Sequence, residues 1–123
     1  EHTFSTVMSW AAADRTARIG RNLKQAWDGE MTEEANALRE GLIARCFSQK
    51  LGSFTVSPGD EGLDAALLQL PALRLLPPED PRLHATVDLT RKALDRGGWL
   101  LRYQTDDGFG VPKVAFTLCT FWL

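Results

Sequence analysis

The chain has 123 residues, with 14 Lys and Arg against 16 Asp and Glu, so its formal net charge is -2. This balance argues against nucleic acid as the main partner, because binding to a phosphate backbone requires a concentrated basic surface. No apolar run reaches the roughly 18 residues that span a bilayer, so we exclude a membrane protein and expect a cytoplasmic one.

Helical patterns dominate the first part of the chain. Residues 3–23 place Val7 and Trp10 among other apolar side chains at helical spacing, which predicts a first helix. Asp28-Gly29 is predicted to break the pattern. Thr32 has the position of an N-cap for a second helix over residues 33–47, whose apolar positions recur every three or four residues.

The middle of the chain predicts one extended segment and two more helices. Residues 51–56 read as a short extended piece that ends at Pro58-Gly59. A nearly all-apolar helix is predicted from about residues 60–64 to Leu70, where Pro71 interrupts it. Pro81, directly after Asp80, is typical of the first turn of a helix, and this helix is expected over residues 81–95.

The last part predicts an extended piece over residues 99–103, a loop over 106–110 and an apolar helix over 113–123. Three large aromatic side chains are expected in the core: Trp10, Phe116 and Trp122. The two cysteines, Cys46 and Cys119, lack the spacing of a zinc site or a disulfide scaffold. We therefore expect no metal and no cofactor.

The second half of the chain repeats the first. Gly52 and Gly98 are 46 positions apart, and so are Asp60 and Asp106. A period of this size, made of one amphipathic and one apolar helix, indicates stacked αα-hairpins in an all-α fold. An open superhelix of HEAT type and a closed double ring both fit. The segments of about 15 residues that join the helices of each repeat favour the closed ring, because loops of that length are usually functional or disordered.

These joining segments combine aromatic rings with charged groups, a combination that suits a sugar site. Ring faces pack on C–H surfaces, and charged groups hydrogen-bond to neighbouring hydroxyls. The residues concerned are Phe54, Asp60, Trp99, Arg102, Tyr103, Asp106 and Asp107.

At these residues the chain resembles the bacterial glucoamylase-like enzymes of glycoside hydrolase family 15, which include glucoamylases, glucodextranases and some trehalases. The matching stretches occur in family order and are residues 2–12, Asp14-Arg15, 52–54, 63–68, 75–82, 101–103, 106–112, 115–116 and 119–122. The resemblance implies an (α/α)6 toroid of twelve helices, of which this chain holds about five. It also implies hydrolysis of α-glucosidic bonds, in α-glucan, an α-glucoside or trehalose, with inversion at the anomeric carbon.

The resemblance also implies where the chemistry lies. Inverting hydrolysis uses a carboxylic acid that protonates the leaving oxygen and a carboxylate that activates water. The family's acid would lie before Glu1 and its base after Leu123, so no catalytic residue is expected within residues 1–123, and the isolated chain should be inactive. Arg102-Tyr103 matches the family's Arg-Tyr pair, which implies a guanidinium on the non-reducing-end glucose. Expected substrate-binding residues are Trp99, Arg102, Tyr103, Asp106 and Asp107.

Structural alternatives remain open for several of these residues. Arg102 could pair with Asp106 or Asp107 on the surface, and Asp106 could serve only its Asp-Gly turn. Asp60 and Asp64 are expected to cap free N–H groups at the start of the apolar helix. His2 could line the mouth of the site, but we expect a bystander.

The ends of the chain predict a segment of one larger catalytic domain. The chain begins with Glu1 rather than Met, and Phe121-Trp122-Leu123 closes an apolar stretch without a polar tail. Such a segment should self-associate through its exposed inner helices. The alternative function is a non-enzymatic αα-repeat module that binds a peptide or protein, and a weaker one is a truncated product without a function of its own.

Overall fold

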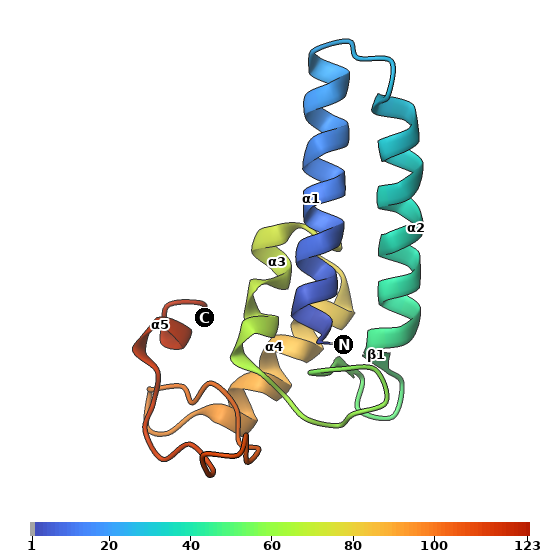
Figure 1. Ribbon diagram of the computed structural model, residues 1–123. Helices are drawn as coiled ribbons and strands as arrows, with labels where there is room; N and C mark the ends of the chain where they lie inside the picture. The colour runs from blue at the N-terminus through green and yellow to red at the C-terminus, as the bar shows by residue number, and fades with distance from the viewer. Residues whose placement is uncertain (1) are drawn as a thin grey trace.

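The computed structural model describes residues 2–123, and it begins with a long antiparallel helical hairpin (Figure 1). Helix α1 spans Thr3–Asn22 and helix α2 spans Asp28–Cys46. The first helix was predicted over residues 3–23, within one residue of the observed bounds, because its buried positions, among them Val7 and Trp10, follow the helical period that the sequence carries. Gly20 leaves room for the Trp27 ring of the connection between the two helices, since a Cβ atom at residue 20 would lie 2.6 Å from that ring.

The start of α2 differs from the prediction. The helix begins at Asp28, so Asp28-Gly29 lies inside its first turn and Thr32 is no N-cap; instead the Thr32 hydroxyl donates to the Asp28 carbonyl at 2.7 Å. The chain reverses earlier, where Lys24 takes a left-handed backbone (φ 52°). Because that residue completes the turn, no glycine is needed there to end α1.

A short hairpin follows α2 and leads toward the cavity described below. Strand β1 (Phe47–Ser48) pairs antiparallel with β2 (Ser53–Phe54), Phe47 opposite Phe54. The extended segment predicted over residues 51–56 therefore forms in part as β2. Beyond it, the Val56 carbonyl accepts the Thr3 N–H at 2.8 Å, which ties this segment to the start of α1.

The predicted apolar helix is shorter and less regular than expected. A 3₁₀ helix, η1, covers Ala65–Gln69, and α3 covers only Leu70–Leu73. Pro71 does not interrupt a helix: it lies in the first turn of α3, where its missing N–H leaves no hydrogen bond unmade. The apolar side chains of η1 and Leu70 are buried, as expected for a nearly all-apolar segment.

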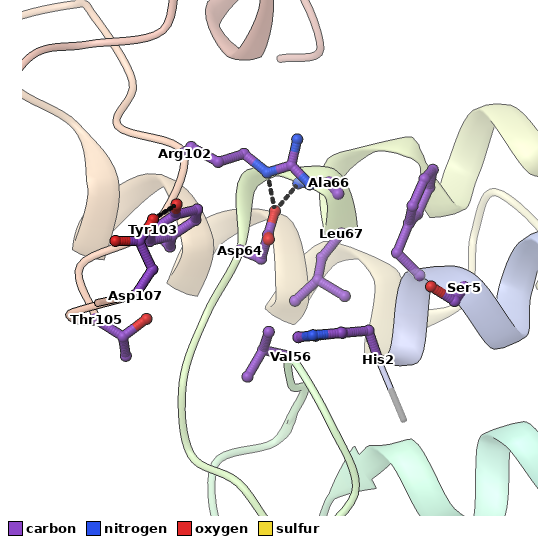
Figure 2. Close-up of a pocket in the computed structure, with 11 residues that line it drawn as sticks. His2, Ser5, Val56, Asp64, Ala66, Leu67, Arg102, Tyr103, Thr105 and Asp107 are labelled. Carbon is purple, nitrogen blue, oxygen red and sulfur yellow. Dashed lines mark hydrogen bonds and ion pairs between the residues drawn. The ribbon is translucent and has the colours of Figure 1, made fainter. Parts of the chain in front are cut away.

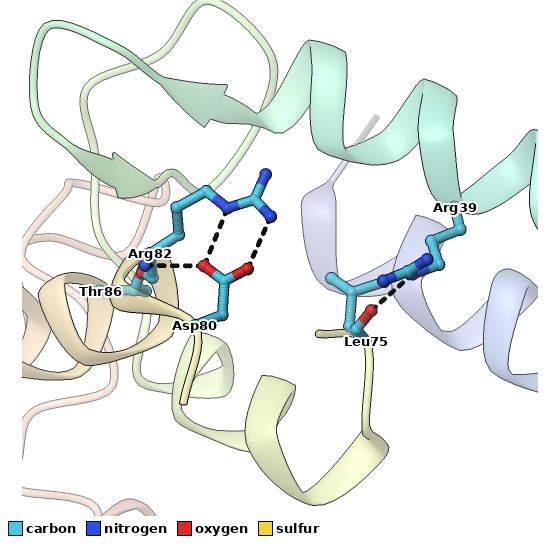
Figure 3. A network of polar contacts seen from close by, with 5 residues as sticks. All are labelled: Arg39, Leu75, Asp80, Arg82 and Thr86. Atoms are coloured by element: carbon cyan, nitrogen blue, oxygen red, sulfur yellow. Dashed lines mark hydrogen bonds and ion pairs between the residues drawn. The ribbon is translucent and has the colours of Figure 1, made fainter. Parts of the chain in front are cut away.

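Helix α4 spans Pro81–Leu94, as predicted, and Asp80 caps it (Figure 3). The Asp80 carboxylate accepts the Arg82 N–H at 2.9 Å. It also accepts the Arg82 side chain twice, at 2.9 Å from Nε and at 2.7 Å from Nη2. These hydrogen bonds lower the pKa of Asp80 from 3.8 to about 2, because they stabilise the ionised carboxylate.

Replacement of Asp80 by Ala should lower the free energy of unfolding by about 1–2 kcal/mol, the usual cost of losing an N-cap. A depressed folded-state pKa means that the carboxylate's contribution is complete above its unfolded pKa of 3.8 and is lost as pH falls through about 2. Urea titrations over this acid range should therefore show a flatter loss of stability in Asp80→Ala than in the parent. Asp80→Asn, which keeps the cap and loses the charge, should flatten the acid limb equally but cost less at neutral pH. An unchanged acid limb in both variants would contradict this role.

The C-terminal segment is mostly irregular, and the helix predicted over residues 113–123 is wrong in extent. Only Thr117–Thr120 (α5) is helical. Phe116 is extended, and its N–H donates to the Leu100 carbonyl at 2.9 Å. The expectation of a buried Phe116 is also wrong, since half of its surface is exposed, whereas Trp10 is buried and Trp122 packs partly buried against the second core cluster. Short helices need packing to persist, and most side chains here are exposed.

Local geometry recurs at the two ends of the 46-residue period. Gly52 and Gly98 both have positive φ, at 64° and 92°. The Asp60 and Asp106 carboxylates each accept the N–H of the residue two positions later, at 2.7 and 2.8 Å. Within residues 2–123, every helix is too short or too polar to cross a bilayer.

Candidate functional site

A cavity of about 390 Å³ opens where four separate segments of the chain converge (Figure 2). The first turn of α1 forms one wall and residues 102–107 form the opposite wall. Between them lie Val56 and the start of η1. The lining residues are His2, Phe4, Ser5, Val56, Asp64, Ala66, Leu67, Arg102, Tyr103, Thr105 and Asp107.

Arg102 and Asp64, which both line this cavity, form an ion pair (Figure 2). Arg102 Nε donates to Asp64 Oδ1 at 2.7 Å, and the same oxygen accepts the Ala66 N–H at 2.7 Å. The Ala65 N–H donates in turn to the Arg102 carbonyl at 2.8 Å. Side chain and backbone therefore both bind residue 102 to the start of η1, although the two segments are 38 residues apart.

The Arg102 guanidinium also contacts an aromatic ring. Its central carbon lies 5.7 Å from the centroid of the Trp122 ring, within cation–π range. The Arg102 side chain remains about one third exposed. It is thus held by a carboxylate and a ring face while part of it still faces the cavity.

A second polar pair, Tyr103 and Asp107, forms the outer side of the cavity. The Tyr103 hydroxyl donates to Asp107 Oδ2 at 2.5 Å, and Asp107 Oδ1 accepts the Phe109 N–H at 3.0 Å. The hydrogen bond from Tyr103 lowers the pKa of Asp107 and raises the pKa of Tyr103. A catalytic acid needs a raised pKa, so Asp107 is unsuited to protonate a leaving group.

The structure brings three of the five predicted substrate-binding residues together at the cavity: Arg102, Tyr103 and Asp107. Trp99 and Asp106 are not among the described residues that line it. Trp99 is 54% exposed. Asp106 Oδ1 accepts the Gly108 and Gly110 N–H groups, at 2.8 and 3.0 Å, which is the turn geometry considered as its alternative. Arg102 pairs with Asp64 rather than with either acidic residue of its own loop.

Sequence reasoning missed several lining residues. His2, expected as a bystander, lines the cavity together with Phe4 and Ser5. Asp64 was expected only as a cap, which it is, but it also pairs with Arg102. The hydrogen bond from Thr3 to Val56 places the start of α1 at the cavity, and no local pattern in the sequence signals this contact. Glu1 lies outside the described residues.

The cavity supplies donors and acceptors in pairs beside apolar surface, which is how proteins bind polyhydroxyl compounds. Within residues 2–123, no group of three His, Cys, Asp or Glu side chains is placed to hold a metal ion. Cys46 and Cys119 are free and buried, and burial raises the pKa of the Cys119 thiol. The polar side chains that line the cavity therefore offer hydrogen-bond donors and acceptors to a ligand.

Solved structures of glycosidases share this fold. The structure described as "Glycosidase E335A in complex with glucose" superposes with a TM-score of 0.84 at 18% identity, covering 99% of this chain and 32% of that one. The structure described as "Glycosidase Wild Type" gives 0.79 at 19% identity, covering 98% of this chain and 32% of that one. The chain thus has part of a helical glycosidase fold.

The sequence comparisons identify the family. The sequence model of glycosyl hydrolases family 15 matches residues 1–123, so the chain belongs to that family. The trehalase of Mycobacterium tuberculosis H37Rv is 39% identical over 130 residues, which cover 98% of this chain and 18% of that protein. The trehalase of Mycolicibacterium smegmatis is 36% identical over 130 residues, covering 98% and 19% respectively. The chain spans less than a fifth of the length of these two relatives.

Proposed function

We propose that residues 1–123 form one part of an (α/α)6 catalytic domain that hydrolyses α-glucosidic bonds with inversion, and that the Arg102 cavity binds a glucose unit of the substrate. The observation that carries this proposal is the Arg102–Asp64 ion pair in a cavity that Tyr103 and Asp107 also line. Trehalose and α-linked glucose oligosaccharides are the substrates proposed, in line with the trehalases among its relatives. A cytoplasmic location is kept as part of the proposal.

The proposed division of labour follows from the chemistry. An inverting hydrolase requires a proton donor and a base commonly 6.5–9.5 Å apart. Of the carboxylates lining the cavity, Asp64 is committed to Arg102 and a backbone N–H, and Asp107 has a lowered pKa with both oxygens bonded. Both are better suited to binding than to proton transfer. We therefore place the catalytic pair outside this chain, and we assign to this segment the holding of the sugar.

The hydroxyls of one sugar ring would meet the cavity as follows. The terminal nitrogens of Arg102 can donate to two adjacent hydroxyls, because a guanidinium presents its N–H groups in one plane. The Asp107 carboxylate, whose ionised form is stabilised by Tyr103, has further lone pairs with which to accept hydrogen bonds from the sugar. His2 lies on the opposite wall of the cavity. Trp99 and Asp106, which do not line the cavity of this chain, would contribute only to a more distant part of a longer substrate.

Arg102→Ala in the full-length polypeptide should reduce kcat/KM for trehalose or maltose about 10- to 100-fold, since hydrogen bonds from a charged donor contribute about 1.5–3 kcal/mol. Glucose release during steady-state hydrolysis is the measurement. Arg96→Ala is the matched control, because Arg96 binds only nearby carbonyls in an exposed turn. Unchanged kcat/KM in Arg102→Ala would overturn the proposal. Glucose release by the isolated chain would overturn the placement of the catalytic pair.

A further inference from the structure

Asp64 joins the start of η1 to the cavity wall formed by residues 102–107 through a single oxygen. Its Oδ1 accepts both the Ala66 N–H and Arg102 Nε, each at 2.7 Å, while its side chain is only 16% exposed. The neighbouring Asp60 is exposed, and its carboxylate accepts only from residues close in sequence: the Gly62 N–H at 2.7 Å and the Ser57 hydroxyl at 3.5 Å. A cap at the start of η1 needs only the hydrogen bond to the Ala66 N–H, so the contact of Asp64 with Arg102 is additional to capping.

This contact fixes which edge of Arg102 faces the cavity. A free arginine side chain loses about 2 kcal/mol of rotamer entropy when it is ordered. Asp64 holds the Nε edge and the Trp122 ring lies against the guanidinium face. The side chain is consequently ordered before any ligand arrives, and the entropy cost is removed from binding.

The same contact sets the charge of the cavity. Arg102 is the only Arg or Lys among the described residues that line the cavity. Asp64 and Asp107 are the carboxylates among them. Asp64 balances Arg102, so among these lining side chains the carboxylate of Asp107 is left as an excess negative charge. An anionic ligand would meet a paired guanidinium and an unpaired carboxylate, whereas an uncharged sugar avoids that repulsion.

We propose that Asp64 is the positioning residue of Arg102 and that, by balancing its charge, Asp64 makes the cavity select uncharged sugars over phosphorylated or acidic ones. This inference rests on the proposed function. It adds a residue that acts through Arg102 and a chemical class of ligand that the cavity rejects.

The test measures competitive inhibition of the full-length polypeptide by glucose and by glucose 6-phosphate. Asp64→Ser keeps an N-cap but is too short to reach Arg102. It should raise the inhibition constant of glucose about tenfold, equivalent to about 1.4 kcal/mol. It should also lower the ratio of the inhibition constant of glucose 6-phosphate to that of glucose about tenfold, because the guanidinium is no longer balanced by a carboxylate. A merely structural loss would weaken both inhibitors equally and leave the ratio unchanged, which would overturn the proposal.

Two further variants separate charge from position. Asp64→Asn keeps the cap and an acceptor for Arg102 but removes the charge. The ratio should therefore shift as in Asp64→Ser, with a smaller loss of glucose affinity. Asp60→Ser, on the same loop, is the matched control and should change neither constant. If Asp64→Ser fails to fold, as judged by circular dichroism, the ratio in Asp64→Asn decides alone.

A double variant tests whether Asp64 acts through Arg102. In an Arg102→Ala background, Asp64→Ser should cause no further loss of glucose affinity, because the group it positions is gone. Additive losses would mean that Asp64 acts independently of Arg102 and would overturn the proposal. If Arg102→Ala itself leaves glucose inhibition unchanged, the proposed function fails as well. If Arg102→Ala weakens glucose and Asp64→Ser does not, only the present inference fails.

Discussion

Phe54→Ala should lower the free energy of unfolding by about 3–5 kcal/mol, the usual cost of deleting a buried aromatic ring. The Phe54 side chain is fully buried (0% exposed) in the larger core cluster, which also contains side chains of α1, α2, η1, α3 and α4. Its ring packs edge-on against Phe47, with centroids 5.3 Å apart. Since small domains are stable by only about 5–15 kcal/mol, a large part of the chain's stability would be lost. Urea unfolding followed by tryptophan fluorescence is the measurement.

The consequence would extend to the cavity. The Phe54 N–H donates to Thr86 Oγ1 on α4 at 3.0 Å, and two residues further the Val56 carbonyl holds the start of α1. Loosening this strand should therefore displace Val56 and weaken its hold on the start of α1. Phe47→Ala is the matched control: it removes a ring of the same size that is only partly buried, and its loss should be clearly smaller. Equal losses in both variants would mean that the core does not depend on Phe54 in the way described.

Elements whose local signals agree with their packing could be predicted from the sequence. Helix α4 has a cap at Asp80, a proline in its first turn and a regular apolar stripe, and it forms where expected. Helix α1 likewise carries its buried face in its spacing. In both helices the residues whose spacing predicts the helix are also the ones buried in the core, so the local pattern and the tertiary packing favour the same structure.

Elements whose form depends on distant contacts could not be predicted at the same level. The N–H groups of Ala65 and Phe116 bind the carbonyls of Arg102 and Leu100. These partners are remote in sequence, so propensity alone suggested two regular apolar helices where the structure has η1 with α3 and the single turn of α5. The start of α2 differed for another reason, because Lys24 adopted the left-handed conformation that the pattern assigned to glycine.

The candidate site divides in the same way. Arg102, Tyr103 and Asp107 are close in sequence and could be proposed together from the family resemblance, and they line one cavity. The capping role of Asp64 was visible in its position before the apolar run. Its partner was not, because a hydrogen bond across 38 residues leaves no periodic signal. His2 adjoins Thr3, whose hydrogen bond to Val56 joins the start of α1 to the cavity, and this contact too leaves no local signal in the sequence.

The isolated 123-residue chain should self-associate through the apolar side chains of its C-terminal segment. Phe109 is 99% exposed and Phe121 is 81% exposed, and Val114 and Leu118 are exposed nearby in sequence. Fully burying one side chain of this size contributes about 1.5–3 kcal/mol, so a shared interface involving several of them favours association. Sedimentation equilibrium should give a mass above that of the monomer. Phe109→Ser with Phe121→Ser should weaken the association constant at least about tenfold.

The matched control removes a similar apolar area elsewhere. Ile19 and Leu23, at the far end of α1, are also exposed large aliphatic side chains, so Ile19→Ser with Leu23→Ser should leave the association nearly unchanged. A monomeric parent chain, or equal effects of the two double variants, would contradict the assignment to the C-terminal segment. In the full-length polypeptide the proposed domain would cover Phe109 and Phe121. There the first pair of substitutions should reduce stability rather than change the oligomeric state, because the buried apolar contact is then intramolecular.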